Sequence, residues 1–158
     1  MSPEYTQLIA AYAAGPAELT AAAAGLSTEQ LRSRPVAGKW STHEVICHIA
    51  DFEPVYLDRI KRVIAENEPT MFSGDPDLFA AKLYYEARDT ATELAFIAGC
   101  RRHLTAILQQ LSDSDFQRVG QHSEAGPLSL EKLLRNVTGH IPHHVKFIAE
   151  KRQALGVS

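Results

Sequence analysis

The chain has 158 residues, of which 45% are apolar and 22% are charged, and its formal net charge is -3. This length suits one domain with a substantial core. The slight acidity and the lack of a basic patch argue against nucleic acid as a partner. No apolar run is long enough to cross a membrane and no signal peptide is visible, so we expect a cytoplasmic protein. The two cysteines, Cys47 and Cys100, are too few for a disulfide scaffold and are expected to be reduced.

The N-terminal half of the chain predicts two long helices with a short one between them. Apolar residues recur at helical spacing over residues 3–24, where Pro16 is expected to bend or interrupt the helix. Residues 27–30, Ser-Thr-Glu-Gln, have the pattern of a capping box and predict a short helix. A second capping box opens a long helix over residues 41–66, in which Pro54 is expected to introduce a kink.

The C-terminal half predicts two further long helices. The third is expected over residues 78–111, with a buried side marked by Leu83, Ala87, Leu94, Ile97, Leu104 and Leu108. A connection with one turn near residues 114–116 follows, and Ser129 then caps a last helix that runs to about Leu155. No β-alternation of useful length competes, and no linker divides the chain. We therefore predict an all-α four-helix bundle formed by residues 1–158 as a single domain, with the order of the helices left open.

Three of the seven histidines lie close together near the C-terminus, at positions 140, 143 and 144. On a helix, His140 and His144 are one turn apart and close enough to share a metal ion. At about 100° per residue, His144 falls inside the apolar stripe of the last helix, His140 falls at its rim, and His143 points away. The two histidines spaced to chelate a metal are therefore the two that face the core.

The second helix supplies one further histidine on its inner side. The same angular analysis puts His48 at the edge of the apolar stripe, whereas His43 and Cys47 fall well outside it. Three neutral imidazoles that leave one coordination position open are typical of a catalytic metal site rather than a closed structural one. The alternative is that these histidines are core residues satisfied by hydrogen bonds, and spacing alone does not separate the two interpretations.

Two carboxylates on the second helix are candidates for acid–base chemistry. Asp51 is one turn from His48 and could hold its ring by a hydrogen bond, although a solvated surface acid is an equal alternative. Glu53 falls on the apolar side, where a buried carboxylate needs a partner. Arg101 faces the core from the third helix, so we predict a Glu53–Arg101 pair that is structural rather than catalytic. His122, before the last helix, either lines the cleft or is an exposed loop residue.

The segments that contain these histidines resemble a known family. Residues 38–44, Gly-Lys-Trp-Ser-Thr-His-Glu, and residues 48–53, His-Ile-Ala-Asp-Phe-Glu, are similar to the DinB-like (YfiT-like) superfamily of metal-dependent enzymes. So are residues 126–130, Gly-Pro-Leu-Ser-Leu, and residues 140–144, His-Ile-Pro-His-His. The resemblance spans nearly the whole chain, and the two histidine segments are its most specific part.

The resemblance implies a homodimeric four-helix bundle that holds a divalent metal, zinc or nickel, on three histidines. Carried over by motif, these are His48, His140 and His144. The family includes bacillithiol- and mycothiol-dependent transferases or isomerases, which suggests a low-molecular-weight thiol as a co-substrate. We therefore expect a metal-dependent enzyme of the thiol-transferase or hydrolase type that acts on a small molecule. The alternatives are a non-catalytic, stress-related protein that binds a metal or a small molecule, and a purely structural bundle.

Overall fold

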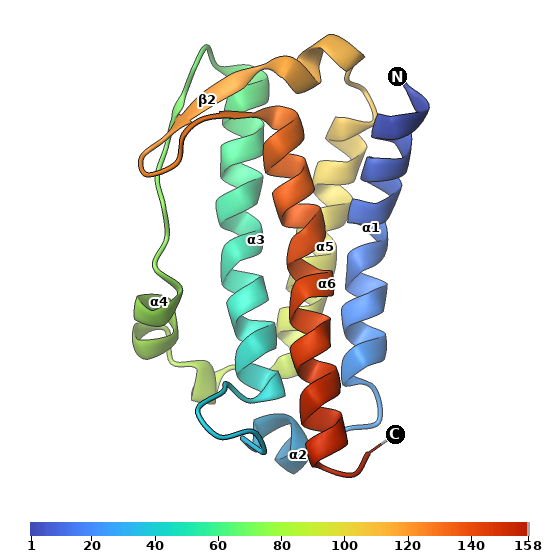
Figure 1. Ribbon diagram of the computed structural model, residues 1–158, viewed down its shortest axis with the longest axis vertical. Helices are drawn as coiled ribbons and strands as arrows, with labels where there is room; N and C mark the ends of the chain where they lie inside the picture. The colour runs from blue at the N-terminus through green and yellow to red at the C-terminus, as the bar shows by residue number, and fades with distance from the viewer. Residues whose placement is uncertain (158) are drawn as a thin grey trace.

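The protein is described by a computed structural model that covers residues 1–157. Four long helices pack side by side around one core (Figure 1). They are α1 (Pro3–Ala23), α3 (Thr42–Ala65), α5 (Thr90–Leu108) and α6 (Leu130–Ala154). The structure thus confirms the predicted all-α four-helix bundle.

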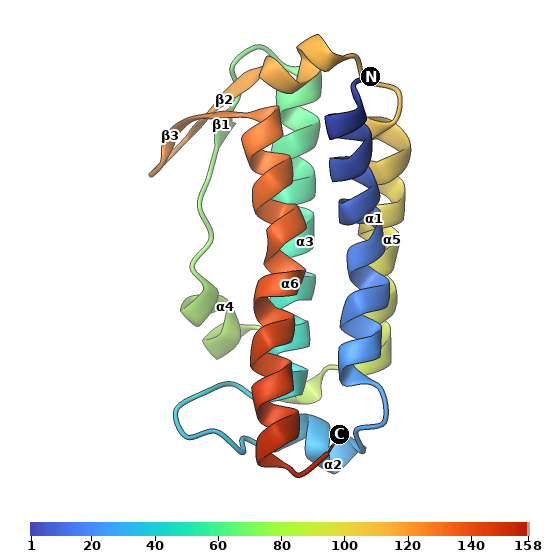
Figure 2. The same ribbon diagram turned by 45° about the vertical axis from the view of Figure 1, so that its right-hand side comes forward.

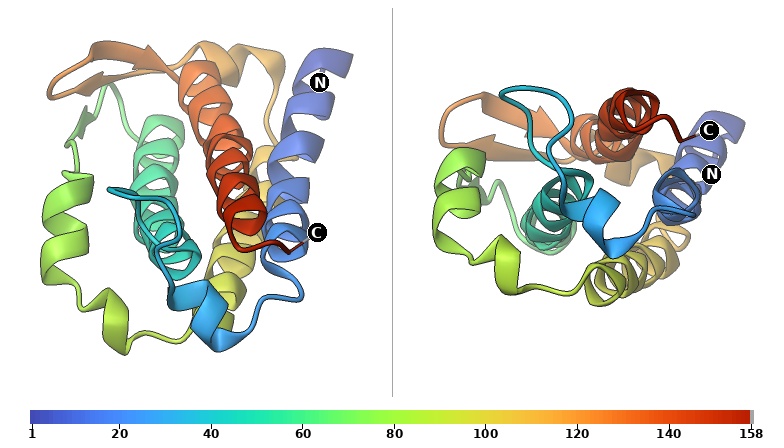
Figure 3. Two further views of the ribbon diagram at one scale, coloured as in Figure 1. Left: turned by 60° about the horizontal axis from the view of Figure 1, so that its bottom comes forward. Right: turned by 90° about the horizontal axis from the view of Figure 1, so that it is seen from below.

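The helices are connected in an order that the sequence left open. α1 packs against α5 and α6, and α3 packs against the same two helices on the other side (Figure 2). α1 and α6 run in one direction, and α3 and α5 run in the other (Figure 1). Because α3 and α5 are parallel neighbours, the chain between them must return along the length of the bundle. This crossover connection, residues 66–89, runs outside α3, as the view from below shows (Figure 3).

The connections carry several short elements. These are α2 (Thr28–Arg32), β1 (Thr70–Met71), α4 (Pro76–Lys82), η1 (Tyr85–Ala87), η2 (Asp113–Gln117), β2 (Val119–His122) and β3 (Gly126–Ser129). The strands form a small sheet in which β1 is parallel to β2 and β2 is antiparallel to β3. The sequence predicted no strand, because segments of two to four residues are too short to show alternation.

The predicted third helix over residues 78–111 is wrong. The chain leaves the helical path after Lys82, and Tyr84 adopts a left-handed backbone conformation with φ 49°. A new helix begins only after Asp89, whose side chain accepts a hydrogen bond from the backbone N–H of Thr92. Leu83 is 42% exposed, so it belongs to the connection rather than to the core. The apolar spacing happened to continue in register across a real break in the helix.

The three helix starts predicted from serine caps agree with the structure. The side chains of Ser27, Ser41 and Ser129 each accept a backbone N–H at the first turn of their helices. The first two form complete capping boxes. α1 continues through Pro16, and α3 and α6 each also contain one proline. Among residues 1–157, no helix is both long and apolar enough to cross a membrane.

One buried ion pair lies inside the bundle. Glu53 and Arg101 are each about 1% exposed, and Nε of Arg101 donates to Oε1 of Glu53 at 2.8 Å. The guanidinium also donates to the carbonyls of Tyr12 at 2.9 Å and Val137 at 2.8 Å. The carbonyl of Tyr12 is free to accept because Pro16, four residues later, has no N–H. Arg101 therefore joins all four helices, and the predicted Glu53–Arg101 pair is confirmed.

Candidate metal centre

The structure brings together the three histidines that the sequence singled out. His48 comes from α3, and His140 and His144 come from successive turns of α6. Nε2 of His140 lies 3.1 Å from Nε2 of His48 and 3.1 Å from Nε2 of His144. The three residues form a cluster whose potential ligand atoms all lie within 4.8 Å of one another. His48 is 6% exposed and the other two are half-buried, so the cluster is largely but not completely shielded from solvent.

The donor set fits a divalent metal ion. Imidazole nitrogens bind zinc at about 2.0–2.1 Å, which puts two ligands of a tetrahedral ion roughly 3.4 Å apart. The observed separations of 3.1 Å need little adjustment to reach that value. The Nδ1 atoms of all three rings are buried without a hydrogen-bond partner among the described residues. Nε2 of His140 has either one proton to donate or one lone pair to accept with, so its two 3.1 Å contacts cannot both be full hydrogen bonds of the kind that core histidines form.

Burial keeps these imidazoles in the form that binds metals. It lowers the pKa of His48 to about 4, although the nearby Asp51 and Asp77 oppose the shift. Burial also lowers the pKa of His140 to about 3 and that of His144 to about 3, and the neighbouring imidazoles add to both shifts. All three rings are therefore neutral near pH 7, with lone pairs free for a cation.

Asp51 does not orient His48 by a hydrogen bond. Its Oδ1 accepts a hydrogen bond from Nη1 of Arg88 at 2.8 Å, and its Oδ2 has no partner among the described residues. Arg88 also pairs with Glu93 near the start of α5. Asp51 therefore links α3 to the crossover connection through Arg88. It makes no hydrogen bond to His48, as one prediction had it, and it is not a solvated surface acid, as the alternative had it.

Glu53 is likewise occupied by structural contacts. Burial raises its pKa, and the Arg101 guanidinium opposes that rise. Its Oε2 is buried without a partner among the described residues. Neither Glu53 nor Asp51 lines the cleft described below, so the structure does not place either candidate where a substrate would meet it.

The remaining histidines lie outside the cluster. His143 is exposed, as its helical angle predicted. His43 is buried, because the crossover packs on the side of α3 opposite to the core, and it contacts Thr90 Oγ1 and the carbonyl of Tyr85 at 2.7 Å each. His122 neither lines the cleft nor lies in an exposed loop. It is half-buried in β2, where its Nδ1 accepts two backbone N–H groups of the following turn.

A cleft of about 270 Å³ opens beside the histidine cluster and includes His144 in its wall. Its other lining residues are Gly38, Lys39, Trp40, Val45, Asp77, Phe147 and Lys151. The Trp40 ring lies 5.2 Å from the His48 ring, and the Phe147 ring lies 6.0 Å from that of His144. This volume is close to the lower end of the roughly 300–1,000 Å³ typical of small-molecule sites.

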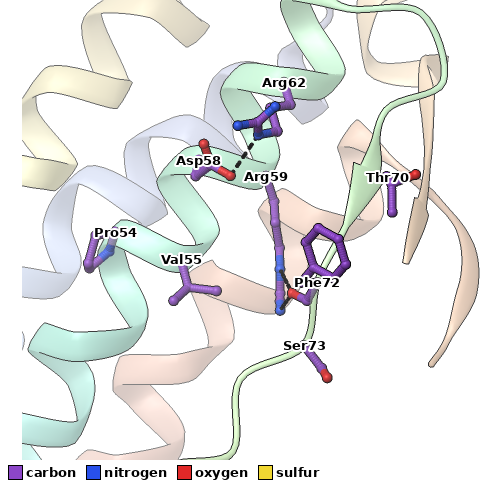
Figure 4. A pocket seen from close by; sticks show the side chains of 8 residues that line it. All are labelled: Pro54, Val55, Asp58, Arg59, Arg62, Thr70, Phe72 and Ser73. Carbon is purple, nitrogen blue, oxygen red and sulfur yellow. Dashed lines mark hydrogen bonds and ion pairs between the residues drawn. The ribbon is translucent and has the colours of Figure 1, made fainter. Parts of the chain in front are cut away.

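A second cavity, of about 480 Å³, lies between α3 and the crossover near β1 (Figure 4). Arg59 crosses it and donates from Nε to the carbonyl of Phe72 at 3.1 Å. Arg62 is held by Asp58 at 2.9 Å. None of the eight residues that line this second cavity is a histidine or a cysteine. The guanidinium groups of Arg59 and Arg62 in its wall already have hydrogen-bond partners. The smaller cleft, beside the three clustered histidines, is therefore the candidate site.

Sequence reasoning missed most of the cleft wall. Asp77 belongs to α4, most of which was expected to be the start of the third bundle helix over residues 78–111, so its position beside the site could not be foreseen. Phe147 and Lys151 carried a usable signal. They follow His144 by three and seven residues, and such spacing keeps side chains on one face of a helix.

The comparisons with known proteins support this interpretation. The sequence model described as the DinB superfamily matches residues 11–148, a span that includes all three clustered histidines. The chain belongs to the DinB superfamily. A superfamily relative from Oceanobacillus iheyensis is 29% identical over 78% of this chain and 71% of its own length. One from Geobacillus kaustophilus is 28% identical over 97% of this chain and 86% of its own. Both carry the name "putative metal-dependent hydrolase".

A solved superfamily structure has nearly the same fold. YfiT from Bacillus subtilis superimposes with a TM-score of 0.92 over 100% of this chain and 91% of its own, at 26% identity. That protein is described as a "probable metal-dependent hydrolase with an unusual four-helix bundle topology". The DinB-like resemblance expected from the histidine segments is thus confirmed at the level of family and fold.

Proposed function

We propose that this protein is a divalent-metal-dependent hydrolase that acts on a small molecule. The observation that carries the proposal is the convergence of three neutral imidazoles beside a cleft that His144 lines, with Nε2 of His140 lying 3.1 Å from Nε2 of each of the other two. Its relatives from two bacteria carry names of the same class, which supports the choice of hydrolysis.

His48, His140 and His144 would hold the ion, and zinc and nickel both suit imidazole ligands. When bound, such an ion polarises carbonyl groups and lowers the pKa of water toward neutrality. Three protein ligands leave a coordination position for water or substrate, as in catalytic rather than structural sites. The aromatic rings of Trp40 and Phe147 would limit the access of bulk water.

The cleft also offers a carboxylate for proton transfer. Asp77 lines it from α4 and is close enough to His48 to influence its ionisation. In the proposed reaction, Asp77 accepts the proton of the attacking water and later returns it to the leaving group. This role replaces the one that the sequence suggested for Asp51 or Glu53.

The test is hydrolysis by protein stripped with a chelator and reloaded with zinc or nickel. Small carboxylic esters and amides would be the substrates, with product release followed by chromatography. We expect turnover that returns with metal and is lost in His140→Ala. The matched control is His143→Ala, which removes an exposed imidazole three residues away and should keep the activity.

A parallel assay with a low-molecular-weight thiol and a model electrophile separates hydrolysis from thiol transfer. If the metal-loaded protein consumes the electrophile only when the thiol is present, the protein is a thiol transferase and the hydrolase proposal is wrong. No turnover by a fully loaded protein in either assay would favour a non-catalytic binding protein.

A further inference from the structure

The far end of the cleft holds two ammonium groups around one aromatic ring. Nζ of Lys39 and Nζ of Lys151 each lie 5.9 Å from the centre of the Phe147 ring. That ring is 6.0 Å from the His144 ring. Lys39 comes from the loop before α3 and Lys151 from the last turn of α6, so two segments distant in sequence place like charges near one ring in the wall of the same cleft.

Lys151 is unusual because it is only 3% exposed. Its ammonium has three donors but makes one hydrogen bond, to the carbonyl of Phe147 at 3.1 Å. A basic residue in the last turn complements the helix dipole, but that role needs no burial. Burial lowers the pKa of Lys151, and Lys39 adds to this effect while Glu150 and Glu44 oppose it.

The two charges are not neutralised by the protein. Among the residues that the structure describes, neither Lys39 nor Lys151 forms an ion pair with a carboxylate. Glu44, the acid on the adjacent turn of α3, is already paired with Arg34. Asp77 is the single carboxylate in the cleft wall, so two cations face one anion there. A buried cation without a counterion is costly unless a ligand supplies the opposite charge.

The rest of the cleft wall is aromatic or aliphatic. Trp40 lies in the loop just before α3, Val45 lies in the first turn of α3, and Phe147 lies on α6. An apolar wall with a few convergent polar groups is the usual form of a small-molecule site.

We propose that the substrate is a small molecule with a carboxylate or phosphate group attached to an apolar body. Lys39 and Lys151 bind the anionic group, and Trp40 and Phe147 contact the apolar body. The bond to be cleaved then lies toward His144 and the other two imidazoles. This inference adopts the catalytic role of the cleft from the proposed function and adds the class of substrate.

Trp40 provides a reporter, because it is the only tryptophan and lines the cleft. We would titrate the protein with phenylacetate, phenyl phosphate and the neutral isostere phenylacetamide, and follow tryptophan fluorescence. The titrations are run on both metal-stripped and zinc-loaded protein. Because the stripped protein offers no metal for the anion to bind, it reports on the lysines alone.

We expect at least one of the two anions to bind saturably to the stripped protein and roughly tenfold more tightly than the amide. Lys151→Met should remove most of that difference and leave binding of the amide unchanged. Lys39→Met is a second test variant, which should also weaken anion binding. Because the Lys39 side chain is exposed, this substitution does not put folding at risk. Lys146→Met is the matched control, because this exposed lysine is on the same helix but outside the cleft.

Equal binding of anion and amide, or anion binding that neither cleft lysine affects, would overturn the proposal. An equal loss in Lys146→Met would also overturn it, since the effect would then be one of net charge. A preference for phenyl phosphate over phenylacetate, or the reverse, identifies which anion the site selects. The titrations of the stripped protein need neither metal nor turnover, so their outcome is independent of the hydrolase proposal. Anion binding can be found in a protein that does not hydrolyse, and it can be absent from one that does.

Discussion

The guanidinium of Arg101 occupies the space directly over Gly15. A Cβ atom added to Gly15 would lie 2.2 Å from Nη1 of Arg101, far inside van der Waals contact. The glycine lets α1 approach a buried cation that also binds the carbonyls of two other residues and Glu53. The close approach of α1 therefore depends on the absence of one methyl group.

Gly15→Ala should accordingly destabilise the protein by about 1–3 kcal/mol, because the guanidinium must move away from its partners. Gly99→Ala is the control, since Gly99 is also inside a helix but has no atom within 4 Å of an added Cβ. That substitution should stabilise the fold by about 0.5–1 kcal/mol. Urea unfolding measures both. Equal effects of the two substitutions would show that Arg101 is not fixed against α1.

The Glu53–Arg101 pair should behave as a coupled unit. Arg101→Met should cost about 3–5 kcal/mol, because it leaves the Glu53 carboxylate buried without its partner. Glu53→Gln should cost less, since the guanidinium keeps its bonds to the Tyr12 and Val137 carbonyls. In a double-mutant cycle the losses should not add. Additive losses would mean that the pair contributes no interaction energy.

This pair also shows what helical periodicity can predict. Glu53 and Arg101 could be matched because each occupies an apolar face, and His48, His140 and His144 emerged for the same reason. Periodicity fixes which way a side chain points once the helix is known. It says nothing about packing between elements, so the route of the crossover, and with it the place of Asp77, could not be derived.

The break in the helix after Lys82 shows what helical periodicity cannot predict, namely where one helix ends and the next begins. The apolar residues on both sides of it fall in one helical register, so the pattern predicted an unbroken helix. Asp89, the N-cap of α5, was the local signal that a new helix starts. The buried state of His43 was missed for a related reason, because the crossover covers a face of α3 that would otherwise meet water.

The stability of the metal-free protein should fall as the pH is lowered from about 6.5 to 5. The three clustered histidines have pKa values of about 3–4 in the fold, and an unfolded histidine titrates near 6.5. In this window the unfolded chain binds more protons than the folded chain, so stability rises with pH. Each histidine contributes at most about 1.4 kcal/mol per pH unit.

Urea midpoints at several pH values measure this slope, and most carboxylates titrate only below the window. His140→Gln should make the slope smaller, because one of the depressed groups is removed. His143→Gln serves as the comparison, since it lies at the surface. An unchanged slope in His140→Gln would contradict the assignment of buried, neutral imidazoles.

If the metal-loaded protein is the proposed hydrolase, Asp77→Asn should reduce its turnover number by about 100-fold or more, as expected for loss of a general base. It should leave the metal content unchanged, because Asp77 is not one of the clustered ligands. Asp58→Asn, which alters an exposed acid in the other cavity, is the control and should retain activity. Full activity in Asp77→Asn would assign the proton transfer to another group.

The central claim is that His48, His140 and His144 bind one metal ion, and elemental analysis tests it most directly. The protein would be purified without an affinity tag, and the metal content of the original protein, His140→Ala and His143→Ala would be compared after equilibration with zinc or nickel. We predict about one divalent ion per chain in the original protein and in His143→Ala, and almost none in His140→Ala. A protein that takes up no stoichiometric metal, or a His140→Ala variant that keeps it, would contradict the assignment.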